Sequence, residues 1–219
     1  MVLKLSSWKM EILWFKMNRY NILCFGDSIT YGCWDKACGG WVTRLRTSYQ
    51  SNQGKDQYIV YNLGISGQNV LEINERFDSE CQPRMTETGK NIIVIAIGIN
   101  DSQIRDQKEY VSKEVFKAKL ENLLKKAKTY TPTILCVGLT QVDEAFTCPR
   151  PNNPTIYYYN QRIEEYNQII KQTCIENNVH YLYMFDAFTI NDLSDGLHPN
   201  EIGHQKMSTR IKEKIDTLI

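Results

Sequence analysis

Short apolar runs alternate with longer amphipathic stretches along this chain from residue 20 onward, and this alternation restricts its fold more than any other feature. The runs are rich in β-branched and aromatic residues, as strands covered on both faces are. They predict strands at 20–25, 58–63, 91–97, 133–139 and 179–185. The stretches between them have apolar residues at three- and four-residue steps, and they predict helices at about 40–52, 69–86, 112–130, 157–177 and 200–218.

Strand–helix alternation of this kind predicts one α/β domain with a mostly parallel sheet and right-handed crossovers. We place the domain at residues 17–219, a length that can bury a sizeable core. The segment 1–16 is an N-terminal extension of unassigned role, with a short amphipathic surface helix as one alternative; its four charged residues exclude a signal peptide or a membrane span. The proline-rich stretch at 140–156 predicts a long loop at the rim of a site.

Composition narrows the class of protein. Hydrophobic residues make up 42% and charged residues 23% of the chain, and the net charge is +1. This balance favours neither nucleic acid nor an anionic membrane as a partner. The seven cysteines form no C-x-x-C pair, which argues against a zinc site. Several lie in apolar runs, where they act as small buried hydrophobes, so we expect a reduced, cytoplasmic chain.

The first polar cluster, Gly26-Asp27-Ser28, comes directly after the first predicted strand. A serine at a tight strand-to-helix turn is presented at the sheet edge, close to the free N–H groups of the helix. A nucleophile elbow has this arrangement, although the G-x-S-x-G spacing is absent. In the alternative interpretation, Asp27 or Ser28 only caps a helix. Both interpretations are open on this segment alone.

The second cluster is Asp195-x-x-His198, after the last predicted strand. A serine nucleophile needs a base, and the base needs an acid that fixes its tautomer. Only three histidines are available: His180 lies within a predicted strand, where a half-buried structural role is expected, and His204 lies within the last helix, where surface or packing roles prevail. A helix cap or a surface ion pair is the competing interpretation of Asp195 and His198.

Two further clusters follow the second and third predicted strands. Asn100, in Gly98-Ile99-Asn100-Asp101, could donate its amide N–H to a developing oxyanion. An Asn-Asp turn that closes a strand is the alternative. Gly64, in Asn62-Leu63-Gly64-Ile65-Ser66-Gly67, could bring a backbone N–H close to a substrate, or could simply be part of a turn.

Together the four clusters resemble the sequence blocks of the SGNH family, also called GDSL-type esterases and lipases. Ile29 stands where leucine is commoner in the first block. The resemblance covers residues 26–198, and the four short motifs are specific only in combination. It implies a three-layer α/β/α, flavodoxin-like domain with about five mostly parallel strands.

The resemblance also implies roles for individual residues. Ser28 would attack the acyl carbon, His198 would be the general base and then the acid, and Asp195 would orient His198. The oxyanion hole would comprise the backbone N–H groups of Ser28 and Gly64 and the side-chain amide of Asn100. Gly26, Asp27 and Asp101 would support these residues, and no metal or organic cofactor would be required.

The leading hypothesis is therefore hydrolysis of a small-molecule carboxylic ester with a small or medium acyl group, without stable membrane association. A carbohydrate acetylesterase and an acyl thioesterase are alternatives within the enzyme class, and the oligomeric state is open. A non-catalytic binding module with the same fold is the alternative outside it, although a binder has no need of Ser28, Asn100 and His198 together. Trp34, Trp41 and Tyr31 could line an acyl or aryl pocket, or be buried under a helix. Arg105 could bind an acidic substrate group, or be a solvated charge.

Overall fold

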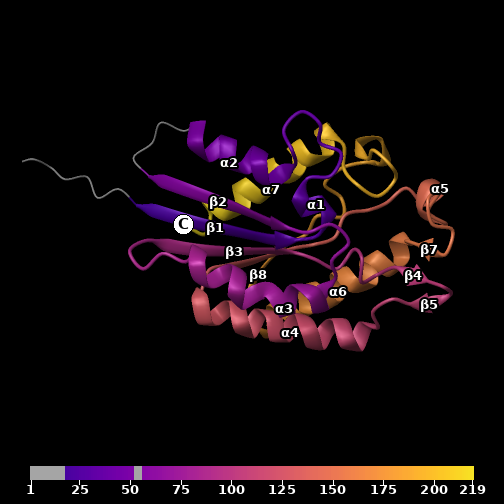
Figure 1. The fold of residues 1–219 in the computed structure, drawn as a ribbon, viewed down its shortest axis with the longest axis horizontal. Helices are drawn as coiled ribbons and strands as arrows, with labels where there is room; N and C mark the ends of the chain where they lie inside the picture. The colour runs from indigo at the N-terminus through magenta and orange to yellow at the C-terminus, as the bar shows by residue number, and fades with distance from the viewer. Residues whose placement is uncertain (1–17, 52–55) are drawn as a thin grey trace, which may run out of the picture.

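The computed structural model describes residues 18–51 and 56–219, so the extension predicted at residues 1–16 lies outside the described residues. Five parallel strands form the central sheet (Figure 1), and pairing between them gives the order β2-β1-β3-β6-β8. This is the flavodoxin-like order of doubly wound sheets. The five strands that the apolar runs predict are thereby confirmed, with bounds β1 Arg19–Gly26, β2 Gln57–Gly64, β3 Lys90–Ala96, β6 Ile134–Val137 and β8 His180–Leu182.

The register of the sheet aligns the ends of its central strands. Gly26 of β1 is paired with Gly64 of β2 on one side and with Ala96 of β3 on the other. The segments that follow these three residues therefore leave the sheet at one edge, side by side. The strand order reverses next to β1, and α/β proteins bind ligands at such a point.

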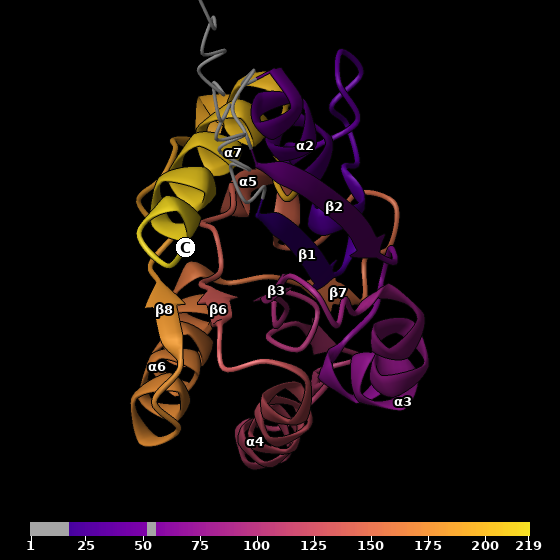
Figure 2. The same ribbon diagram turned by 90° about the vertical axis from the view of Figure 1, so that its left-hand side faces the viewer.

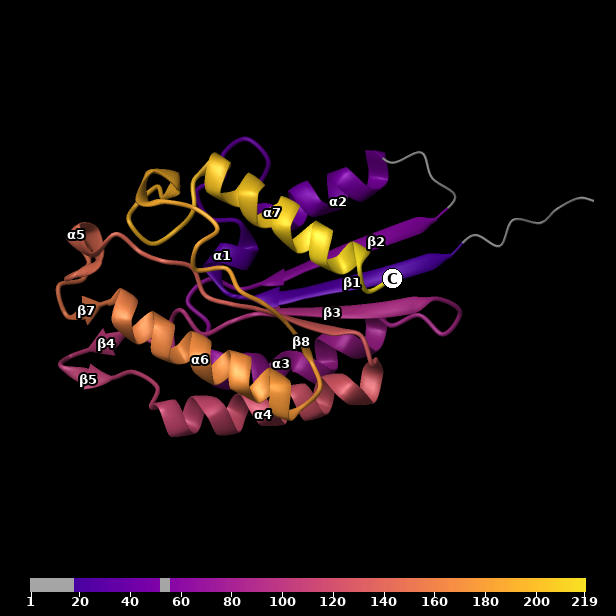
Figure 3. The ribbon, with the colours of Figure 1, turned by 180° about the vertical axis from the view of Figure 1, so that it is seen from behind.

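Helices cover both faces of the sheet and complete the three predicted layers (Figure 2). α2 and α7 pack on one face, and α3, α4 and α6 on the other, as the view from behind also shows (Figure 3). Their bounds are α2 Trp41–Ser51, α3 Val70–Cys81, α4 Lys113–Tyr130, α6 Asn160–Glu176 and α7 Glu201–Asp216. Among the described residues, no helix has the length and apolar character that a bilayer crossing requires.

Short elements account for the main differences from the sequence prediction. The predicted loop at 140–156 contains the one-turn helix α5 (Glu144–Thr147) and runs into strand β7 (Ile156–Tyr157). β7 pairs with β4 (Ile104–Arg105), which pairs with β5 (Lys108–Glu109), and the three make a small antiparallel sheet. α6 therefore begins later than predicted, and α3 ends before the 3-10 turn η1 (Gln82–Arg84), which contains Pro83.

Candidate active site

Ser28 is the first residue of the one-turn helix α1 (Ser28–Tyr31), directly after β1. Asp27 is the helix cap, because its Oδ1 accepts a hydrogen bond from the Ile29 N–H at 2.9 Å. Gly26 permits the tight turn: a Cβ there would lie 2.1 Å from Oγ1 of Thr30. The cap and nucleophile interpretations of this segment are thus compatible, since Asp27 caps the helix and the Ser28 hydroxyl is left for another partner.

That partner is His198. Ser28 Oγ lies 2.8 Å from His198 Nε2, and His198 Nδ1 lies 2.9 Å from Asp195 Oδ2. Burial alone would raise the pKa of Asp195, but hydrogen bonds from His198 and from the Leu197 N–H hold that pKa well below its usual range. An ionised carboxylate only accepts hydrogen bonds, so Nδ1 of a neutral His198 carries the proton and Nε2 offers a lone pair to Ser28.

A second aspartate lies nearby but faces elsewhere. Asp192 ends the 3-10 helix η2 (Ile190–Asp192), and its Oδ2 accepts hydrogen bonds from Lys206 Nζ at 2.7 Å and from the Thr189 N–H at 2.8 Å. Asp195, by contrast, also accepts the backbone N–H of His198 through Oδ1, at 2.8 Å. The geometry therefore pairs the imidazole with Asp195 rather than with Asp192.

Asn100 and Asp101 follow β3 and face different directions. Asn100 lines the same pocket as Ser28, and its Nδ2 donates to the carbonyl oxygen of Gln68 at 2.9 Å. Asp101 Oδ1 instead accepts the backbone N–H of Val70, at the first turn of α3, at 3.0 Å. Burial raises the pKa of Asp101 to about 7. Asp101 thus holds the start of α3.

Gly64 does not have the position predicted for it. Its N–H already donates to Oδ1 of Asn62 at 3.0 Å, and Gly64 does not line the pocket of Ser28. A Cβ at Gly64 would lie 2.2 Å from the backbone N of Tyr31, so glycine is needed there because β2 approaches α1 closely. Gly67, three residues later, does line the pocket with Ser28. The Ser66-Gly67 pair was the sequence signal for this residue.

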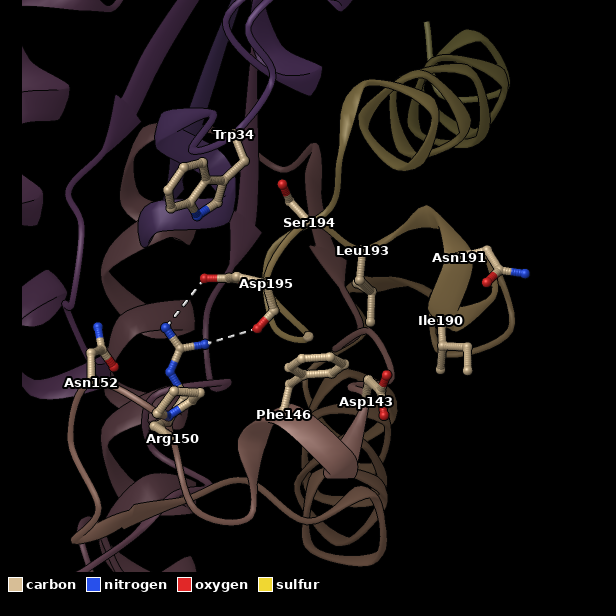
Figure 4. Close-up of a pocket in the computed structure, with 12 residues that line it drawn as sticks. Trp34, Asp143, Phe146, Arg150, Asn152, Ile190, Asn191, Leu193, Ser194 and Asp195 are labelled. Atoms are coloured by element: carbon tan, nitrogen blue, oxygen red, sulfur yellow. Dashed lines mark hydrogen bonds and ion pairs between the residues drawn. The ribbon is translucent and has the colours of Figure 1, made fainter.

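The pocket over Ser28 has a volume of about 760 Å³, and a second pocket of about 540 Å³ adjoins it. Both are lined by Trp34, Arg150, Asn152 and Asp195. Figure 4 shows the guanidinium of Arg150 extended toward Asp195, to which it donates at Oδ2 (3.2 Å) and at the backbone oxygen (3.4 Å). Arg150, from the predicted loop, is a site residue that sequence reasoning missed.

The structure also places the remaining aromatic and histidine candidates. Trp41, the first residue of α2, is fully buried, whereas Trp34 is 48% exposed and lines both pockets. His180 is exposed, so its predicted half-buried state is wrong: it begins β8 at the edge of the sheet. His204 is buried, accepts the Trp41 N–H at Nδ1 (3.2 Å), and donates from Nε2 to the oxygen of Cys33 (3.0 Å). Burial lowers the pKa of His204, which keeps it neutral.

Comparison with known proteins agrees with this geometry. Residues 24–206 match the GDSL-like lipase/acylhydrolase family. No curated protein sequence matches the chain. Among solved structures, the acetyl xylan esterase Axe2 from Geobacillus stearothermophilus is similar with a TM-score of 0.68 and 21% identity, over 89% of this chain and 93% of that chain. A variant of Axe2 gives a TM-score of 0.70 at 20% identity, over 91% and 96%.

LAE5, an α/β hydrolase enzyme from the metagenome of Lake Arreo in Spain, is also similar, with a TM-score of 0.67 and 18% identity over 92% of this chain and 96% of that chain. At these identities the solved structures share the fold. The match over 24–206 contains all four sequence blocks and the pocket residues from Ser28 to His198. The chain therefore belongs to the GDSL-like lipase/acylhydrolase family, the SGNH hydrolases, and is a carboxylic ester hydrolase.

Proposed function

We propose that this hydrolase cleaves esters of small or medium acyl groups through a covalent acyl-enzyme at Ser28. The single observation that carries the proposal is the series of hydrogen bonds from Ser28 Oγ through the His198 ring to Asp195. Three structures of the Geobacillus esterase are described as catalytic mutants, at a serine, an aspartate and a histidine. That aspartate and histidine lie three positions apart, as Asp195 and His198 do.

In the first half of the reaction, Ser28 Oγ attacks the ester carbonyl while its proton passes to His198 Nε2. Asp195, ionised and bonded to Nδ1, stabilises the imidazolium that forms. When the tetrahedral intermediate collapses, its bond to the alcohol oxygen breaks and the Nε2 proton goes to that oxygen. A water molecule then attacks the acyl-enzyme by the same route, which releases the acid and restores the Ser28 hydroxyl.

The negative charge of the tetrahedral intermediate needs donors that are already in place. The N–H of Ser28 belongs to the first turn of α1, where helix N–H groups have no partner within the helix. Asn100 and Gly67 line the same pocket, so the Asn100 amide and the Gly67 N–H complete the proposed oxyanion hole. Gly67 takes the place first expected for Gly64.

The proposal is tested with p-nitrophenyl acetate, butyrate and octanoate. We expect Ser28→Ala to lose almost all activity toward each ester, and a fluorophosphonate probe to label the wild type but not this variant. Comparable rates in both proteins, or labelling of both, would remove the serine mechanism. The ratio of kcat/KM among the three esters reports acyl-chain preference.

The adjoining pocket favours a second, narrower candidate: an acetyl ester of a carbohydrate. Trp34 and Phe146 line it with exposed fractions of 48% and 54%, beside the amides of Asn152 and Asn191. Aromatic faces and planar amides suit the apolar faces and hydroxyls of a sugar ring. Trp34 has a φ of 70°, a strained conformation for a bulky residue and one that is often found at functional sites.

This candidate predicts that Phe146→Ala, at a residue that lines the adjoining pocket but not the pocket over Ser28, raises KM for an acetylated xylooligosaccharide and leaves KM for p-nitrophenyl acetate unchanged. An equal effect on both substrates would show that the pocket does not hold a sugar.

We also propose a reducing, cytoplasmic location for the enzyme. All seven cysteines are free thiols, and Cys24, Cys81, Cys136 and Cys174 are buried, which supports this location. Fractionation of the native host with an antibody to the protein tests it, and recovery from the medium would contradict it.

A further inference from the structure

A chain of hydrogen bonds ends at the side-chain amide of Asn100, and one of its members, Tyr158, also lines the pocket over Ser28. Arg105 donates from Nε and Nη2 to Gln103 Oε1, at 3.1 and 2.9 Å. Gln103 Nε2 donates to the Tyr158 hydroxyl at 3.2 Å, and that hydroxyl donates to Asn100 Oδ1 at 3.0 Å. Asn100 Nδ2 then donates to the Gln68 carbonyl. We call Arg105, Gln103, Tyr158 and Asn100 the amide relay.

The chemistry of its two ends fixes the direction of every bond in the relay. Arg105 only donates, so the atom of Gln103 that faces it must be the oxygen. The Gln103 nitrogen therefore faces Tyr158, whose hydroxyl must accept that bond and send its one hydrogen to Asn100. The receiving atom of Asn100 must then be Oδ1, which agrees with the carbonyl acceptor that Nδ2 meets at Gln68. One Nδ2 hydrogen is left for the pocket that Asn100 lines.

The small antiparallel sheet brings the relay residues together. Arg105 of β4 is paired with Ile156 of β7, and Tyr158 follows β7 directly. Gln103 and Tyr158 are 2% and 5% exposed, so water competes little for their hydrogen bonds. Burial also raises the pKa of Tyr158, so the phenol stays protonated and remains a donor. The Arg105 guanidinium stacks on the Tyr110 ring, with its carbon 4.0 Å from the ring centre.

We propose that the amide relay orients the Asn100 side chain as an oxyanion donor. Because the Arg105 guanidinium donates the first hydrogen bonds of the relay, the relay also strengthens that donor. This inference rests on the proposed function, in which Asn100 stabilises the tetrahedral intermediate. Tyr158 and Arg105 act through Asn100 and are positioning residues. Each bond polarises the next toward the pocket, and such cooperativity strengthens a bond by roughly 10–30% in condensed phases. Without Tyr158, the amide of Asn100 could also rotate and present its oxygen to the oxyanion.

The test is a double-mutant cycle with p-nitrophenyl acetate. Loss of one oxyanion donor lowers kcat about 100- to 1000-fold, which we expect for Asn100→Ala. Tyr158→Phe removes only the group that orients this donor, and we expect kcat to fall about 10-fold with KM unchanged, the signature of an interaction made in the transition state. In the Asn100→Ala background, Tyr158→Phe should change kcat less than 2-fold, because its target is gone.

Two further variants complete the design. Tyr159→Phe removes the hydroxyl of the neighbouring tyrosine, which is exposed, and should retain wild-type kcat. Arg105→Met tests the relay from its far end, with an expected fall in kcat of about 3-fold. It also serves if Tyr158→Phe does not fold, and thermal melting of each variant identifies that case.

Three results would overturn the relay: a Tyr158→Phe effect on KM rather than kcat, equal effects of Tyr158→Phe with and without Asn100, or wild-type kcat in both Tyr158→Phe and Arg105→Met. Failure of the serine mechanism is recognised separately. In that case Ser28→Ala keeps its activity and the wild type resists fluorophosphonate labelling, whatever the relay variants do.

Discussion

Among the described residues, no cationic side chain bonds to the buried carboxylate of Asp27. Its replacement by asparagine tests how much this burial costs in stability. Burial raises the pKa of Asp27 from its ordinary value of 3.8 to about 6, although the N–H of Ile29 partly opposes the shift. A group with a raised pKa contributes stability below pH 3.8 and loses it as the pH rises to about 6. A shift of about two units corresponds to about 3 kcal/mol.

Asp27→Asn keeps an oxygen that can accept the Ile29 N–H, which lies 2.9 Å from Oδ1 of the aspartate, and it cannot ionise. From pH 4 to pH 8, ionisation of Asp27 should lower the unfolding free energy of the wild type by about 2 kcal/mol. The variant lacks this loss, so its unfolding free energy relative to the wild type should rise by the same amount. The comparison of two pH values cancels any fixed effect of the extra amide hydrogens. Urea denaturation at both pH values measures the difference.

Asp143 supplies a matched control, because it also caps a helix and its Oδ1 accepts the Ala145 N–H at 3.0 Å, but it is only partly buried. Asp143→Asn makes the same change of side chain at a helix cap that is not fully buried, and its urea denaturation at both pH values gives the baseline for the comparison. If Asp27→Asn behaves like this control, the carboxylate of Asp27 is not destabilised by burial and the reasoning is refuted.

Three other outcomes follow from the site. Asp195→Asn should lower kcat about 10⁴-fold, because an amide favours the wrong tautomer of the imidazole. Asp192→Asn should keep its activity in the same ester assay. The reverse pattern would show that Asp192 is the acid. Gly64→Ala should lower the melting temperature sharply, since the new Cβ would meet the backbone of Tyr31, and an unchanged melting temperature would contradict this contact. Because the pKa of His204 is lowered, its contribution to stability is complete above pH 6.5 and is lost as the pH falls below that value. His204→Gln should remove this part of the pH dependence of urea unfolding. An identical pH profile in the variant and the wild type would contradict this prediction.

The sequence predicts those helices and strands that are long enough to show a regular pattern of apolar residues. Each strand of the central sheet comes from a continuous apolar run, and the helices that cover the sheet have apolar faces that recur at helical steps. β4, β5 and β7 are two residues long, so no periodicity can reveal them. Their pairing joins Arg105 of β4 to the segment that ends at Tyr158, and this is why sequence reasoning, which weighed Arg105 only as a contact for an acidic substrate group, could not predict its link to Asn100 through Tyr158.

The glycines after β2 show a different limit. Gly64 and Gly67 lie three residues apart, and both have neighbours that could belong to a pocket. Which of them faces Ser28 depends on the side chain of Asn62, which takes the N–H of Gly64, and on the close packing of α1. Neither contact can be read from local sequence. The segments of Ser28, Asn100 and His198 could be predicted to meet, because parallel strands end at one edge of the sheet.

The bond between Ser28 and His198 joins residues 170 positions apart. The nucleophile follows the first strand of the sheet and its base precedes α7, so a growing polypeptide lacks a working centre until residue 198 has left the ribosome. In a refolding experiment, esterase activity would thus report when the segment of His198 packs against Ser28, rather than when the sheet forms. Measured beside intrinsic fluorescence, to which buried Trp41 contributes, it would separate formation of the site from burial of the core.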